Sequence, residues 1–290
     1  GAPPISRLRK PAGLYAYGGK VYVACTDAGS VAVIDDKARK VTYIGDSGTG
    51  KLSNPIGRAG TSDGSRIFVA DAKLGKVYGY DTATGELKLA IGKSNELKNP
   101  VGVALNEGLK RIYVLDSHEA EAVHVYSLTG EPLFRFGKRG LEADGMLYYP
   151  YGIAIDKRNG NVYIVDTQNF RVQVFDKDGV YVRKFGAMGD LPGTFSRPKG
   201  IGVDSEGHVY VVDTAFNNFQ IFDEKGGLLM FIGAPGYDRG NFTGPSGLYV
   251  DENDRIYVAD SLNGRVQIFQ YLSEKWKKEN PEEYKKYLLN

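Results

Sequence analysis

The chain has 290 residues, 42% of them hydrophobic and 25% charged, and a formal net charge of +2. This composition supports a sizeable core and excludes a largely disordered chain, and the near-neutral charge argues against nucleic acid as a partner. The single cysteine, Cys25, excludes an intramolecular disulfide and any Cys-x-x-Cys site. It stands in the apolar stretch VYVACTD, so we expect a buried, unreactive thiol.

The chain starts with the sequence GAPPISRL, which lacks a methionine. This start is either an addition to the natural chain or a processed mature end. A mature end of this kind suits a tether to a removed signal or to a lipid anchor. It therefore predicts an extracytoplasmic location, in a periplasm or at a cell surface. No apolar run approaches the ~18 residues that a membrane span needs.

Four short markers recur along the chain in a fixed order and define a repeat. The first is Pro-x-Gly before an apolar run, which occurs at Pro11, Pro55, Pro100, Pro150, Pro198 and Pro245. An apolar run that ends in Asp, an alternating strand and a run that ends in Gly follow it. The copies lie 44 to 50 residues apart. Such a period is typical of a propeller, and four short strands per copy predict one four-stranded antiparallel sheet for each.

The turns and the two chain ends complete this prediction. Stretches such as DKDG and DSEG supply the glycines that tight hairpins need. The last copy lacks its fourth strand, so we expect residues 5–9 to supply it and close the ring, which removes an open sheet edge. A linear β-solenoid is the structural alternative. The predicted fold is thus an all-β, six-bladed β-propeller closed by an N-terminal strand.

A short helical tail is expected after the last strand. Ser273 is a suitable helix cap, and Pro281 within NPEE is a typical first helical residue. The lysines around Trp276 suggest a partly exposed indole ring. These signals divide the chain into a propeller over residues 1–272 and a helical C-terminal tail over residues 273–290.

The repeat resembles the NHL repeat. The segment PYGIAIDKRNGNVYIVDTQNFRVQVFDKDGVYVRKFG comes close to that family's full pattern, as does PSGLYVDENDRIYVADSLNGRVQIF. The resemblance covers about residues 5–272 and is stronger in the last three copies than in the first two. It implies a six-bladed propeller, in agreement with the repeat count. It implies no single chemistry, because such propellers serve as protein-binding, RNA-binding or enzymatic scaffolds.

The sequence offers no convergent catalytic set. The Asp at the end of each second strand is expected to accept backbone N–H groups in the following turn. Some NHL-like lyases use metal-bound histidines in the channel, but His118, His124 and His208 fall on different columns of the repeat. Three ligands are therefore not expected to converge. We predict no catalytic residues, no metal site and no cofactor.

Departures from the repeat mark the candidate binding residues. Arg58 stands where the other copies have Leu, Val or Ile, so it either joins two blades or meets a ligand at the channel mouth. Aromatic and cationic side chains also gather near the Pro-x-Gly motifs and in the loops beside them, although the aromatics could equally pack the loops between blades. The predicted binding residues are Arg58, His118, Tyr149, Tyr151, Arg171, Arg197, Lys199 and Phe216.

The leading functional hypothesis is a non-catalytic scaffold that presents a loop-rich face and channel mouth to a protein or peptide partner. By analogy, we expect a monomer or a component of a bacterial cell-envelope assembly. One alternative is a metal-dependent lyase or lactonase-like hydrolase with its site in the channel. Another is a propeller that binds single-stranded RNA through a basic, aromatic face, against which the near-neutral charge argues.

Overall fold

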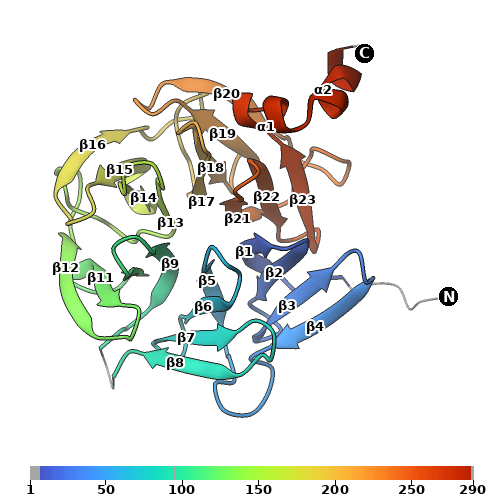
Figure 1. The fold of residues 1–290 in the computed structure, drawn as a ribbon. Coiled ribbons are helices and arrows are strands. Elements are labelled where there is room, and N and C mark those ends of the chain that lie inside the picture. Colours follow the sequence, from blue (N-terminus) through green and yellow to red (C-terminus); the bar gives the residue numbers. More distant parts are fainter. Residues whose placement is uncertain (1–6, 94–95, 289–290) are drawn as a thin grey trace.

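The computed structural model describes residues 7–93 and 96–288 and shows six β-sheets arranged as blades around a central axis (Figure 1). The chain passes from one blade to the next in sequence order, and β1 of the first blade contacts β21 of the last. Within each blade, consecutive strands are antiparallel neighbours. The predicted six-bladed β-propeller is confirmed.

The strands follow the predicted repeat. Blades 1 and 2 contain β1 (Pro11–Tyr17), β2 (Lys20–Cys25), β3 (Ser30–Asp35), β4 (Lys40–Ile44), β5 (Pro55–Gly60), β6 (Arg66–Asp71), β7 (Lys76–Asp81) and β8 (Leu87–Ile91). Blades 3 and 4 contain β9 (Pro100–Asn106), β10 (Arg111–Asp116), β11 (Glu121–Ser127), β12 (Pro132–Lys138), β13 (Ile153–Ile155), β14 (Val162–Asp166), β15 (Arg171–Phe175) and β16 (Tyr181–Phe185), with a 3-10 turn at Thr167–Asn169. Blades 5 and 6 contain β17 (Pro198–Val203), β18 (Val209–Asp213), β19 (Asn218–Phe222), β20 (Leu228–Ile232), β21 (Pro245–Val250), β22 (Arg255–Asp260) and β23 (Arg265–Gln270).

The sixth blade has three strands within the described residues. The predicted closing strand, residues 5–9, lies partly outside them. In its described part, the backbone N–H of Leu8 donates to the carbonyl of Gly264 at 3.0 Å. The Nε of Arg7 donates to the carbonyl of Asn263 at 2.8 Å. Arg7 and Leu8 therefore lie beside the turn that leads into β23 of the last blade.

The apolar core is divided among the interfaces between neighbouring blades. Val31 of blade 1 and Ile67 of blade 2 share one cluster, and Val165 of blade 4 and Val209 of blade 5 share another. Cys25 is buried, as predicted, and the structure places it between blades 6 and 1. A single antiparallel sheet cannot cover both of its own faces, so each blade depends on the two beside it.

The glycine of the Pro-x-Gly motif lies where the innermost strands converge. A Cβ atom there would stand only 1.8–2.5 Å from backbone atoms of the next blade, at Gly13, Gly57, Gly152, Gly200 and Gly247. No side chain fits at that distance. The motif therefore reflects a close approach between blades, for which glycine is required.

The tail forms helices α1 (Glu274–Glu279) and α2 (Pro281–Leu288), and α2 projects beyond the ring (Figure 1). The hydroxyl of Ser273 caps α1 as predicted, accepting the backbone N–H of Trp276. It also donates to Asp254 at 2.6 Å, which ties the helix to blade 6. The expectation of a partly exposed Trp276 was wrong. The indole is 7% exposed, and its ring lies edge to face with that of Tyr287 in α2, with centroids 6.2 Å apart.

Candidate functional site

The two ends of the ring differ in their loops. One end, here called the loop face, carries the connections between blades and the loops between second and third strands. The other end, here called the hairpin face, carries the tight turns within the blades. The longest connections on the loop face lead into blades 4, 5 and 6, over residues 139–152, 186–197 and 233–244.

These long connections are held in a fixed shape by the blade that follows them. In blade 5, the side chain of Gln220 accepts the N–H of Gly193 at 2.7 Å and donates to the carbonyl of Thr194 at 2.8 Å. The buried ring of Phe195 anchors the same connection from below. Gln173 and Gln267 make the corresponding pairs of bonds in blades 4 and 6. The connections on the loop face therefore have a conformation that is fixed by side-chain hydrogen bonds.

Arg171, one of the predicted binding residues, is part of this construction. Its Nε donates to Asp166 at 2.8 Å, and both side chains are almost fully buried. Its remaining N–H groups donate to the carbonyls of Glu142, Ala143 and Met146 at 2.6–2.9 Å. The guanidinium thus fixes the connection into blade 4. Its hydrogen-bonding capacity is largely used within the chain, so a binding role stays an untested prediction.

In blades 2 to 6, the Asp at the end of the second strand has the predicted role in turns. In the described part of the chain, Asp27 of blade 1 does not, because it is exposed and pairs with Lys10 at 3.7 Å. In blade 5, Asp213 accepts the backbone N–H groups of Ser196, Arg197, Ala215 and Phe216 at 2.7–3.2 Å. Asp71, Asp116, Asp166 and Asp260 likewise accept backbone N–H groups and are buried. The bonds to Asp213 place Arg197, which is exposed, and Phe216, which is half-buried, on either side of this turn.

Two predicted residues, His118 and Tyr149, meet on the loop face. Their rings lie edge to face, with centroids 5.2 Å apart. The guanidinium of Arg139 lies 4.6 Å from the centroid of the Tyr149 ring, an attractive cation–π distance. The structure therefore joins His118 and Tyr149 into one aromatic and cationic cluster, to which the sequence prediction did not assign Arg139.

A second pair, Tyr151 and Lys199, lies beside the axis. The Lys199 amine lies 5.2 Å from the centroid of the Tyr151 ring. Burial raises the pKa of Tyr151 to about 12. Burial also lowers the pKa of Lys199, and the positive charges of Arg197 and Lys10 add to this lowering. Cations thus cluster near the axis on the loop face.

Exposed apolar side chains gather on the same face. Within the described residues, six large hydrophobic side chains are at least 60% exposed, and five of them lie on the loop face: Leu141, Met188, Leu191, Tyr237 and Leu262. The sixth, Val180, lies in a hairpin turn of blade 4. None of these residues was predicted from the sequence. The sequence could have identified most of them, because they are large apolar residues in glycine-rich connections, outside the alternating pattern of the strands.

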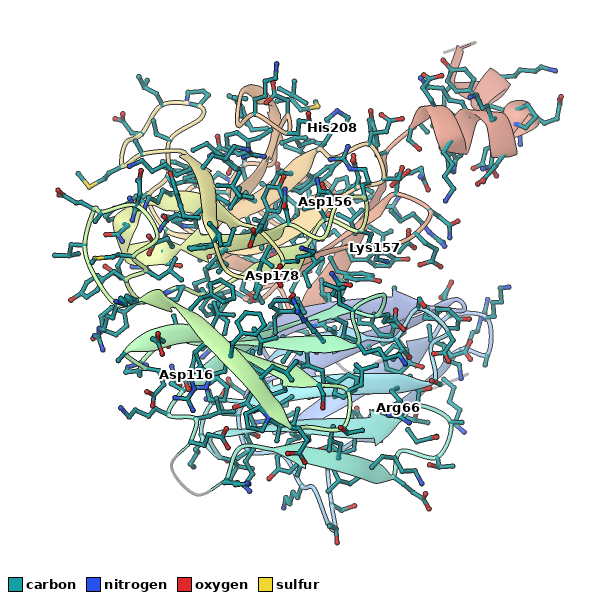
Figure 2. The ribbon with its side chains drawn as sticks, turned by 60° about the vertical axis from the view of Figure 1, so that its left-hand side comes forward. Arg66, Asp116, Asp156, Lys157, Asp178 and His208 are labelled. Carbon is teal, nitrogen blue, oxygen red and sulfur yellow. The ribbon has the colours of Figure 1, made fainter. Side chains whose placement is uncertain are left out.

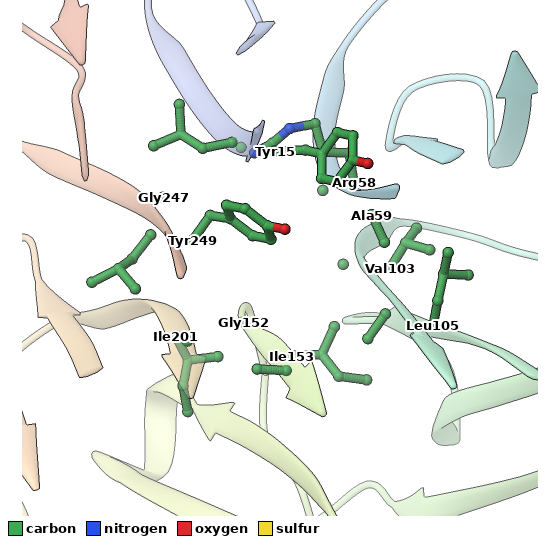
Figure 3. Close-up of a pocket in the computed structure, with 18 of the residues that line it drawn as sticks. Tyr15, Arg58, Ala59, Val103, Leu105, Gly152, Ile153, Ile201, Gly247 and Tyr249 are labelled. Carbon is green, nitrogen blue, oxygen red and sulfur yellow. The ribbon is translucent and has the colours of Figure 1, made fainter. Parts of the chain in front are cut away.

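Arg58 lies deeper than the predicted channel mouth. It lines a central cavity of about 250 Å³ formed by the inner strands of all six blades (Figure 3). Its side chain is 8% exposed and reaches into blade 1, where Nε donates to the carbonyl of Tyr22 at 3.0 Å. Within the described residues, Arg58 forms no ion pair with an acidic side chain. It does join two blades, as one of the two interpretations predicted.

The histidines do not converge. His208 forms a hydrogen bond with Asp204 at 2.9 Å, and Figure 2 shows it well apart from Asp116, which stands two residues before His118. Within residues 7–93 and 96–288, no three His, Cys, Asp or Glu side chains gather as metal ligands would. In the same residues, no helix has the length and apolar character that crossing a bilayer requires.

Comparisons with known proteins agree with this architecture. The NHL repeat family matches residues 242–269, and a family described as a 6-bladed β-propeller matches residues 154–215. Protein lin-41 of Caenorhabditis elegans is 49% identical over 53 residues, which is 18% of this chain and 4% of that protein. The RING finger protein nhl-1 of the same species is 42% identical over 72 residues, which is 25% of this chain and 7% of that protein. The matches thus span under a tenth of these relatives.

Solved structures resemble the chain over most of its length. A protein of unknown function from Bacteroides thetaiotaomicron has a TM-score of 0.74 and 20% identity, over 92% of this chain and 70% of that one. A gluconolactonase from Xanthomonas campestris has a TM-score of 0.71 and 15% identity, over 91% of this chain and 86% of that one. At these identities the likeness concerns the fold alone. The blades described above and the match over residues 154–215 identify the chain as a six-bladed β-propeller, and the NHL repeat family matches it in blade 6.

Proposed function

We propose that the chain is a non-catalytic binding propeller whose loop face holds a protein or peptide partner. The observation that carries the proposal is the concentration of exposed apolar side chains on this face. Large apolar side chains gathered on one surface are typical of interaction sites. The connections that bear them are clamped by Gln173, Gln220 and Gln267, so binding would cost little ordering of loops.

The charges on this face favour a partner with acidic side chains. The charges of Arg197 and Lys10 both act on Lys199. Lys10 pairs with Asp27 at 3.7 Å, whereas Lys199 and Arg197 form no ion pair within the described residues. The Tyr149 cluster adds an aromatic anchor, a residue type enriched at binding hot spots. A peptide with both apolar and acidic side chains would match the apolar connections and the cationic centre together.

Peptide selection tests the proposal. Peptides are selected from a displayed random library on the purified chain, and their affinities are measured for Met188→Asp, Tyr237→Asp and Val180→Asp. Val180 is a matched control, because it is similarly exposed but lies in a hairpin turn. We expect the two loop-face variants to lose at least tenfold in affinity and Val180→Asp to bind as the parent does.

Two outcomes would contradict the proposal. One is that the selected peptides bind all three variants equally well. The other is that the purified chain holds a stoichiometric metal and turns over a lactone. The extracytoplasmic location and the cell-envelope assembly stay predictions, and fractionation of the native cells with an antibody against the chain tests them.

A further inference from the structure

The central cavity opens toward the hairpin face. Its lining begins at the glycines of the Pro-x-Gly motifs, and of the long connections of the loop face it includes only Tyr151 and Gly152, the last two residues before β13. At the other end it reaches Glu107, Lys157 and Glu252, whose side chains are exposed. There it adjoins a second hollow of about 400 Å³ on the hairpin face, and the two share Ser62, Leu105, Glu107, Ile155 and Lys157 as lining residues. A small molecule could therefore enter from the hairpin face without passing the glycines of the Pro-x-Gly motifs.

The cavity has an apolar wall on one side and tyrosine side chains on the other. Blades 3 to 5 contribute apolar side chains, among them Val103, Ile153 and Ile201. Blades 6 and 1 contribute Tyr249 and Tyr15, whose rings lie edge to face at 5.6 Å. Figure 3 shows the Tyr249 ring extending into the cavity with its hydroxyl toward the centre. Such a cavity suits an apolar or aromatic body.

On the side of the cavity that Tyr15 and Tyr249 line, some polar groups lack a hydrogen-bond partner among the described residues. Tyr15 donates to the carbonyl of Thr61 at 2.7 Å, whereas the Tyr249 hydroxyl has no hydrogen-bond partner within the described residues. Beside them, Arg58 makes one hydrogen bond, through Nε, and its Nη2 is buried without a partner in the same part of the chain. The absence of a side chain at Gly13 leaves room for Nη1, since a Cβ there would stand 2.2 Å from it.

Arg58 therefore brings a positive charge to the cavity wall without a counter-charge from the described residues. Burial lowers the pKa of Arg58 well below its ordinary value. An unpaired buried cation is costly, and an anion that reaches it would offset that cost. The carboxylates at the rim are farther out, and that of Glu107 accepts the N–H of Ser62 at 2.9 Å.

We propose that the central cavity binds a small organic acid, whose carboxylate pairs with Arg58 and whose apolar or aromatic body lies between Tyr249 and the apolar wall. The acid enters from the hairpin face, where Lys157 partly offsets the charges of Glu107 and Glu252. This site is separate from the loop face proposed for a protein partner, and neither proposal depends on the other.

Calorimetry and thermal shift with defined probes test this site. The probes are acetate, phenylacetate and 3-phenylpropionate, with phenylacetamide as the neutral counterpart. We expect an aryl carboxylate to bind the parent chain and raise its melting temperature, and phenylacetamide to bind at least tenfold more weakly. Arg58→Leu installs the residue type of the other blades and should weaken the aryl carboxylate at least 30-fold. Arg66→Leu is the control, an exposed arginine of the same blade.

Two further variants are available in case Arg58→Leu does not fold. If Arg58→Leu does not fold, Arg58→Lys and Tyr249→Leu replace it, and both should weaken the carboxylate. The inference is overturned if no carboxylate probe binds the parent at millimolar concentration, if the amide binds as well as the acid, or if the Arg58 variants bind as the parent does. Peptide binding on the loop face should survive Arg58→Leu, so failure of one proposal is distinguishable from failure of the other.

Discussion

His124 shows how one substitution within the repeat changes the chemistry of a buried position. It occupies in blade 3 the position that Gln173, Gln220 and Gln267 hold in blades 4 to 6. Those glutamines bind the connection that precedes their blade. His124 is 1% exposed, and within the described residues neither ring nitrogen has a hydrogen-bond partner. Burial, followed by the charge of Arg135, lowers the pKa of His124.

This lowering predicts a pH dependence of stability. As the pH falls through the unfolded-state pKa of about 6.5, the unfolded chain takes up a proton that buried His124 resists. The free energy of unfolding should then fall by up to about 1.4 kcal/mol per pH unit, until the folded-state pKa is reached. His124→Leu should flatten this slope between pH 7.5 and pH 5.

Urea unfolding at a series of pH values measures the effect. Both chains carry His118→Gln and His208→Gln, so that position 124 is the difference between them. Equal slopes for the two chains would show that His124 does not resist protonation in the folded state.

At the scale of elements, the long connections behave as parts of the blades that they precede. Gln220 and Phe195 hold the connection over residues 186–197 in place, although strand β19 and this connection are well separated in sequence. Arg171 and Asp166 do the same for the connection into blade 4. Predicting this role needs the register between a strand and a distant loop, which no local pattern contains.

The two hydrogen bonds from the Gln220 side chain predict a loss of stability when that side chain is removed. Gln220→Ala leaves the N–H of Gly193 and the carbonyl of Thr194 without their side-chain partner. An unsatisfied buried group costs about 1–3 kcal/mol. Both groups here are only partly buried, so the free energy of unfolding should fall by about 1 kcal/mol, the lower end of that range. Amide hydrogen exchange should also quicken over residues 187–195.

Gln168→Ala is the matched control, because Gln168 is exposed and its side chain makes no hydrogen bond within the described residues. An equal loss of stability in both variants would argue against the clamp.

At the scale of the whole molecule, stability depends on closing the ring. Each blade buries its faces against two neighbours, so the contact between blade 6 and blade 1 completes the core. The described bonds from Leu8 and Arg7 to the turn before β23 add a link from the chain's beginning to its last blade. The side chain of Ile268 in β23 is half-exposed, which marks the edge beside which the predicted closing segment would lie.

Removing residues 1–9 should therefore lower the melting temperature by several degrees, since losing about 1 kcal/mol shifts it by roughly 2–4 °C in chains of this size. It should also promote association through the uncovered strand edge. Calorimetry and light scattering measure the two effects. A chain with residues 1–4 replaced by serines is the control and should behave as the parent does. A truncated chain with unchanged melting would show that these residues do not close the ring.

The sequence by itself determined the blade count, the order of strands and the roles of residues that act locally. The Pro-x-Gly period predicted six blades, and the position of Asp213 before a turn predicted its backbone hydrogen bonds. Ser273 was recognised as a helix cap for the same reason. Each of these features depends on residues close together in the chain, or on a repeat that recurs often enough to be counted.

Only the tertiary structure decided why Gly57 and Gly152 must lack side chains, where Arg58 lies and which face exposes its apolar side chains. The glycines are required because the backbone of the next blade comes within 2.4 Å of the point that a Cβ atom would occupy. Arg58 is placed by a carbonyl of blade 1, 36 residues earlier in the chain. These features arise where blades meet. The glycine period counts the blades, but it does not show which distant backbone segment each glycine faces, nor which carbonyl Arg58 reaches.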